Sequence, residues 1–231
     1  MLFFYNTNVT NIDKNNTNYY NEIEWKWLNM KLYDYLINNY ELNVPILIND
    51  INIKDMSDVN IRKQLSRLIE MKLIEKYAQG VYYLPKKTVL GVSKLSFEDV
   101  VNKKYISNDN EIYGFYSGLS FLNKLGISTQ IPFTYEIVTN KETSRKRVIT
   151  INNRNIILRK PYVEINKNNV LELQFLDFIN SNSINLLKNN YELIKEYIKK
   201  LNKKVFVESL ICYPAKTSKK LIESRLFFDM V

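Results

Sequence analysis

Polar side chains recur at helical spacing in residues 60–67, and their chemistry is that of base recognition. They are Asn60, Lys63, Gln64 and Arg67. Amides and guanidinium groups can form paired hydrogen bonds with base edges in a major groove, and Lys and Arg also bind phosphates. The opposite side of the same helix is apolar, which indicates a helix that packs on a domain and exposes its polar face. The apolar side chains are Ile61, Leu65, Leu68 and Ile69. The alternative to base recognition is an ordinary solvent-exposed helix, which any α+β domain can contain.

A short hairpin is predicted directly after this helix. Gly80 stands where a tight turn needs a positive φ, between two short runs of apolar and aromatic residues. A polar, basic helix followed by a small hairpin is the layout of a winged helix-turn-helix. In that reading Lys76, Gln79 and Tyr82 lie on the wing and contact the DNA backbone or the minor groove.

Residue types that support catalysis or metal binding are scarce. The chain has no histidine, a single cysteine (Cys212) and only five glycines, none of them in a phosphate-binding loop pattern. The closest acidic pair, Asp109 and Glu111, lies in a polar run that reads as a solvated loop. We therefore expect no enzyme activity, no metal site and no cofactor, although a mechanism that uses carboxylates alone is compatible with this composition.

The charge of the chain is unevenly distributed. The net charge is +9, yet residues 22–59 carry three Lys or Arg against seven Asp or Glu, and residues 60–90 carry seven against two. A basic segment that begins at the polar helix suits a polyanionic partner. Residues 141–160 hold seven basic residues against one Glu. This second basic stretch would either contact phosphates or protect the edge of a sheet. Its members are Lys141, Arg145, Lys146, Arg147, Arg154, Arg159 and Lys160.

The expected organisation is an α+β chain in three parts: an Asn-rich arm at residues 1–21, a winged helix-turn-helix at 22–90 and a mixed α/β domain at 91–231. In the first domain we expect helices at 22–38 and 45–53, a polar helix capped by Ser57 or Asp58, and a linker after the wing to residue 93. In the second we expect helices at 95–106, 117–124, 169–181, 187–201 and 217–228. Strands are expected at 134–139, 148–151, 156–158 and 163–165.

The cellular compartment is predicted from weaker signals in the sequence. One cysteine permits no intramolecular disulfide, the first residues lack the pattern of a signal peptide, and no apolar run is long enough for a membrane span. We expect a cytoplasmic protein with no membrane partner.

Three stretches together resemble the AbiEi-type antitoxins of type IV toxin–antitoxin and abortive-infection systems. The first is IRKQLSRLIEMKLIEKYAQGVYYLP at 61–85. The second and most specific is SGLSFLNKLGISTQIPFTYEIVTN at 117–140, followed by RNIILRKP at 154–161. The third is YPAKTSKKLIE at 213–223. Residues 1–21 match no part of this pattern.

The resemblance implies a DNA-binding N-terminal domain that represses its own operon and a C-terminal domain that counteracts a co-encoded nucleotidyltransferase-like toxin. The DNA partner would be the chain's own promoter at an inverted repeat, read by a dimer or by two monomers. The chain lacks the Gly-Ser and Asp-x-Asp signature of the toxin itself. An alternative is a protein-interaction module whose winged helix serves assembly and does not bind DNA.

Overall fold

The computed structural model describes residues 31–89 and 91–229, so the arm expected at residues 1–21 and the start of the first expected helix lie outside the described part. The chain divides into two compact units, the first ending at Lys94 and the second beginning at Leu95. The sequence-based boundary lay between residues 90 and 91. No helix within the described ranges is both long and apolar enough to cross a membrane.

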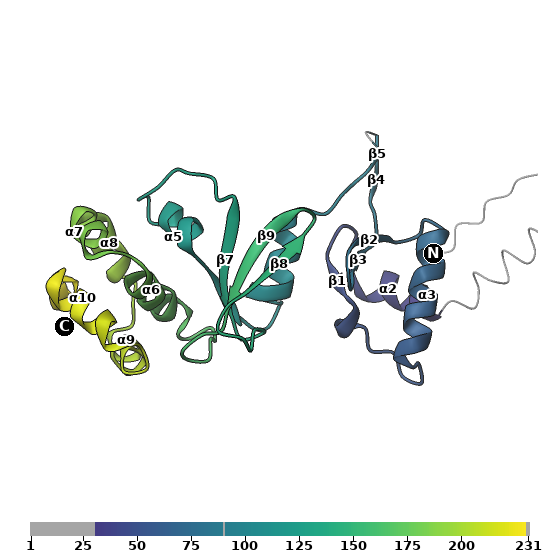
Figure 1. Cartoon of the computed structure of the whole chain (residues 1–231). Helices are drawn as coiled ribbons and strands as arrows, with labels where there is room; N and C mark the ends of the chain where they lie inside the picture. Colours follow the sequence, from purple (N-terminus) through teal and green to yellow (C-terminus); the bar gives the residue numbers. More distant parts are fainter. Residues whose placement is uncertain (1–30, 90, 230–231) are drawn as a thin grey trace, which may run out of the picture. The chain divides into compact units, whose positions relative to one another are not determined.

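The first unit packs two helices against a small antiparallel sheet (Figure 1). Its elements are α2 (Lys31–Asn39), β1 (Ile46–Leu47), the 3-10 helix η1 (Ile48–Asp50), α3 (Asp58–Glu70), β2 (Glu75–Ala78) and β3 (Val81–Tyr83). Strand β3 lies between β1 and β2. Leu32 and Leu36 of α2 and Leu65 and Leu68 of α3 are buried in one apolar cluster, which joins the two helices.

The segment expected as a helix at residues 45–53 is instead a strand followed by a single 3-10 turn. Ile46 and Leu47 pair with Tyr82 and Val81 of β3. The backbone N–H of Ile48 donates to the carbonyl of Gly80 at 3.0 Å. These bonds to the hairpin favour an extended backbone over the helix predicted from Pro45.

The stretch expected as a linker after the wing forms a second hairpin in the first unit. Strands β4 (Lys87–Thr88) and β5 (Gly91–Val92) pair antiparallel. The expected boundary at residues 90 and 91 would have cut through it. The expectation of an unstructured linker is therefore wrong for residues 87–92, whose strand pairing was not predicted.

The second unit is a four-stranded mixed sheet with helices packed on it, so the chain belongs to the α+β class, as predicted. Its N-terminal half comprises α4 (Phe97–Val101), the π-helix η2 (Asn102–Ile106), β6 (Gly114–Ser117), α5 (Gly118–Lys124), β7 (Thr134–Thr139), β8 (Arg147–Ile151) and β9 (Arg154–Arg159). Its C-terminal half comprises α6 (Val170–Ser181), α7 (Ile184–Asn189), α8 (Tyr191–Ile198), α9 (Lys203–Leu210), α10 (Ala215–Glu223) and the 3-10 helix η3 (Leu226–Asp229). The strand order is β6-β7-β9-β8, with β7 and β9 parallel.

The alternation of side chains along β6 places different helices on the two faces of the sheet. Phe115 joins the main apolar cluster, and Ser117 bonds to Asp177 of α6. Tyr116 points the other way and donates to Asn102 of η2 at 3.0 Å. A Cβ at Gly114 would lie 2.0 Å from the carbonyl oxygen of Tyr105, so this face of β6 tolerates no side chain at that position.

Three further expectations in the second unit are wrong. The helix expected at 217–228 ends at Glu223, because Arg225 has a positive φ of 65° before the 3-10 helix η3. Residues 163–165 form no strand, because both the backbone N–H and the C=O of Ile165 bond to the side-chain amide of Asn140. The helix expected at 187–201 is interrupted at Asn190, whose backbone (φ −116°, ψ 25°) is not helical, so it appears as α7 and α8. The apolar spacing continues through the break because α7 and α8 both bury their apolar side chains in one cluster.

Candidate nucleic-acid interface

Helix α3 begins as its sequence predicts. The hydroxyl of Ser57 accepts a hydrogen bond from the backbone N–H of Asn60 at 3.4 Å, the N-cap arrangement that satisfies a free donor of the first turn. Ile61 joins Leu65 and Leu68 in the core. Burial of this apolar side fixes the rotation of the helix, and Asn60, Lys63 and Arg67 are consequently exposed.

Gln64 differs from the other three predicted base readers. It is half-buried, and its Oε1 accepts a hydrogen bond from the backbone N–H of Leu32 at 3.2 Å. The side chain thus satisfies a backbone donor in the first described turn of α2. Gln64 connects the two helices, and the candidate surface rests on the remaining three residues.

The cations of α3 form no ion pair with the described residues of the first unit. Within residues 31–89 and 91–229, neither Lys63 nor Arg67 lies within 4.0 Å of a carboxylate oxygen, while ion pairs are numerous in the second unit. The same helix also exposes Glu70. An exposed cation without a partner keeps its full charge available to an external anion.

The hairpin β2–β3 presents only two of its three predicted contact residues. Lys76 and Gln79 are exposed and bond to each other, Nζ to Oε1, at 3.4 Å. Gly80 has the positive φ that the turn requires, +71°. Tyr82 is only 9% exposed and belongs to the apolar core cluster, so it does not lie on the candidate surface. The neighbouring Tyr83 is buried as well, which the sequence VYY did not indicate.

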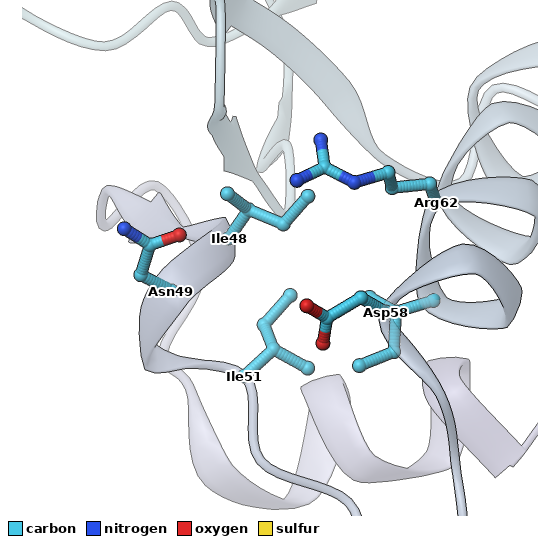
Figure 2. Close-up of a pocket in the computed structure, with 6 residues that line it drawn as sticks. Ile48, Asn49, Ile51, Asp58 and Arg62 are labelled. Atoms are coloured by element: carbon cyan, nitrogen blue, oxygen red, sulfur yellow. The ribbon is translucent and has the colours of Figure 1, made fainter.

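A pocket of about 240 Å³ lies between η1 and the first two turns of α3 (Figure 2). Its lining residues are Ile48, Asn49, Ile51, Asp58, Ile61 and Arg62. Asp58 and Arg62 both extend toward this space in Figure 2. Arg62 was absent from the sequence-based site, although its exposed guanidinium adds a third cation to α3. Helical spacing places position 62 beside the apolar stripe, about 100° from Lys63, so the predicted polar face did not include it.

Much of the predicted second basic surface is engaged within the second unit. Arg147 donates to the buried carboxylate of Glu142 at 2.8 Å. Arg154 lies 3.4 Å from Glu98 and stacks over the ring of Phe97. Lys141 lies over the ring of Tyr113 with its Nζ 4.6 Å from the centroid.

Arg159 is the most deeply engaged residue of that group. Its Nη1 and Nη2 each donate to a different carboxylate oxygen of Asp177 at 2.8 Å, and Nη2 also donates to Ser117. Burial by itself would lower the pKa of Arg159, but Asp177 raises it above its usual value, so the guanidinium remains charged. Arg159 therefore ties β9 to α6 and is not available to phosphate. Arg145, Lys146 and Lys160 are exposed, and each lacks an ion pair within the described residues.

No cluster of three or more His, Cys, Asp or Glu side chains is placed to hold a metal ion within the described ranges. The side chains on α3 and the hairpin can form hydrogen bonds and attract negative charge. They include an amide and three cations on one helix, next to a hairpin that carries a further lysine.

The chain belongs to a protein family of unknown function, DUF6088, whose model matches residues 37–210. That match includes α3, both hairpins and the sheet of the second unit. No curated protein matches the chain significantly.

Proposed function

We propose that the protein is a DNA-binding transcriptional regulator of the winged helix-turn-helix class. The observation that carries the proposal is the outer face of α3, where Asn60, Lys63 and Arg67 are exposed and the two cations form no ion pair with a described residue. A rigid helix held by a cap and an apolar core is the kind of element that can enter a major groove. The hairpin β2–β3 then acts as the wing.

Each residue has a distinct role in this proposal. Arg67 reads a guanine, because a guanidinium reaches O6 and N7 together, and Asn60 suits an adenine. Lys63 on α3 and Lys76 on the hairpin contact phosphates and set the register of the helix. The expected target is an inverted repeat in the chain's own promoter, in the cytoplasm, with no catalytic step.

We extend the proposal to an antitoxin that counteracts a co-encoded nucleotidyltransferase-like toxin. In the second unit Ile131 and Phe133 are 89% and 87% exposed, in the very segment that carries the resemblance to AbiEi-type antitoxins. Asn123 restrains this loop by donating from Nδ2 to the carbonyl of Gln130 at 2.7 Å. Two large apolar side chains on a restrained loop favour a protein partner. The same observation supports the second candidate function, an interaction module that does not bind DNA.

Two measurements test these functions. The full chain should shift its own upstream DNA in a salt-sensitive manner, and a Lys63→Ala/Arg67→Ala variant should lose most of that affinity. Lys204→Ala, on the exposed face of α9, is the matched control and should bind like the wild type. Co-expression with the adjacent gene product tests the antitoxin part, with Phe133→Ser as the variant expected to lose protection. Co-purification with that product but no salt-sensitive DNA shift would leave the interaction module as the function.

A further inference from the structure

The β4–β5 hairpin is attached firmly to the first unit. The hydroxyl of Ser93 donates to Oδ1 of Asn43 at 2.8 Å and accepts from the backbone N–H of Lys86 at 3.0 Å. A second bond, from the Ser93 N–H to the carbonyl of Lys86 at 2.9 Å, closes the stem. Asn43 is itself bonded through its N–H to the carbonyl of Leu84 at 2.7 Å. The base of the hairpin is therefore held by the body of the unit, and the hairpin extends from it (Figure 1).

The tip of this hairpin has a composition that turn geometry does not explain. Thr88 pairs with Gly91, and the hydroxyl of Thr88 donates to the carbonyl of Gly91 at 2.7 Å. Val89 follows Thr88 and is fully exposed, and Val92 on β5 is 51% exposed. Tight turns favour Gly, Asn, Asp, Pro and Ser, whereas a β-branched apolar residue is disfavoured there. Local structure gives no reason for an exposed valine at position 89.

The hairpin and the residue that follows it carry a net positive charge. Residues 85–97 contain three lysines and no Asp or Glu. Lys86, Lys87 and Lys94 are all exposed, and none of them forms an ion pair with a described residue. Lysines do protect free strand edges, but edge protection does not account for an exposed apolar residue between them. A basic stem with an apolar tip complements a polyanion that offers an apolar surface between its charges.

We infer that the β4–β5 hairpin is a second DNA-binding arm that enters the minor groove next to the site of α3. Its lysines contact the phosphates on both sides of the groove, and Val89 packs against the sugars and base edges of the floor. Proteins that bind the minor groove use this combination of basic side chains with an apolar wedge. The inference rests on the proposed DNA-binding function and adds a contact that α3 and the wing do not supply.

The test uses the full chain and a fluorescent duplex of its own upstream region, with affinity measured by anisotropy over a range of salt. Lys86→Gln/Lys87→Gln/Lys94→Gln should bind roughly tenfold more weakly, with a salt slope shallower by about two to three, because each lost phosphate contact removes about 0.9. Lys199→Gln/Lys204→Gln/Lys219→Gln removes the same charge from helices of the second unit and should bind like the wild type. Val89→Ser should bind severalfold more weakly at an unchanged salt slope. Replacing adenines by 2,6-diaminopurine, which adds an amino group to the minor groove, should weaken the wild type more than Val89→Ser.

The outcomes separate this inference from the proposed function. If Arg67→Ala loses affinity while both hairpin variants bind like the wild type, the inferred DNA-binding arm is wrong. The proposed function as a DNA-binding regulator is then unaffected. If the hairpin variants keep their DNA affinity but no longer co-purify with the neighbouring gene product, the hairpin is a protein contact and the inference falls. If the wild type itself shifts no duplex with salt sensitivity, both the function and the arm are wrong. Circular dichroism of each variant verifies that the fold is retained.

Discussion

The outer face of α3 and the β8–β9 hairpin are both rich in Lys and Arg, but they differ in whether the fold pairs these cations with carboxylates. On α3, Lys63 and Arg67 are exposed and lack ion pairs within the described residues. In the second unit, Arg147 and Arg159 are bound to Glu142 and Asp177 of their own fold. The difference shows that charge density along a sequence does not by itself mark a binding surface. A cation is available to a partner only where the fold leaves it without a carboxylate.

The reason lies in what each element packs against. Helix α3 packs through apolar side chains on α2 and the small sheet, so Lys63 and Arg67 on its other side meet no carboxylate of the described residues. Strand β9 lies inside the sheet next to α6, so a polar side chain on its inner face has to find a buried partner.

The largest expected effect is the loss of the buried ion pair between Arg159 and Asp177. Asp177→Ala leaves the guanidinium with only the more distant carboxylate of Glu136, 3.8 Å away, as its counter-charge. The free energy of unfolding of the second unit should fall by up to about 3–5 kcal/mol. Urea denaturation monitored by circular dichroism measures this loss. The double variant Arg159→Met/Asp177→Leu should recover a substantial part of it. A single variant as stable as the wild type would mean that Arg159 is not held in this way and is free for other partners.

The next largest effect concerns α3. Arg67→Ala should weaken binding of the target duplex by about 1–3 kcal/mol and relax specificity at one base pair, because the bidentate contact to guanine is lost. Selection of binding sites from a random library, with wild type and variant in parallel, measures both quantities. Equal losses at every position would instead assign Arg67 to a phosphate.

The sequence predicted those elements that neighbouring residues determine. The cap of α3 at Ser57 or Asp58, helix α3 itself, Gly80 in its turn and strand β7 with its bounds were all identified from neighbouring residues. Features set by distant partners were not predicted. Pairing with β3 made residues 46–47 a strand, a side chain 25 positions away prevented one at 163–165, and packing decided that Tyr82 points inward.

The candidate site shows the same division. Exposure of Asn60, Lys63 and Arg67 follows from the apolar stripe of one helix, so periodicity was sufficient. The inward bond of Gln64 to Leu32 and the pairing of Arg159 with Asp177 depend on segments 32 and 18 residues away. Composition could show that these residues are polar but not what they contact.

A smaller effect is expected from Glu142 as the pH falls. Its burial opposes the charge, yet the backbone N–H of Ser144 and the guanidinium of Arg147 lower its pKa below the ordinary value. A carboxyl with a lowered pKa in the fold stabilises the fold above its unfolded pKa, roughly 4.3, and this contribution is lost as the pH falls through the folded value. The stability of the wild type should therefore decline more steeply with acid than that of Glu142→Gln, as measured by urea midpoints. Parallel declines would mean that Glu142 contributes nothing specific.

The smallest effect is a change in the salt dependence of DNA binding, and it tests the comparison between α3 and the β8–β9 hairpin. The salt dependence reports how many cations contact phosphate. Lys63→Gln should reduce the slope of log affinity against log salt by about 0.9, the value for one lost contact on duplex DNA. Arg154→Gln also removes one positive charge, but its guanidinium already lies against Glu98 and Phe97, so the slope should not change. An equal reduction for both variants would show that the β8–β9 cations leave their internal partners when DNA binds. The two stretches would then differ only in the free protein.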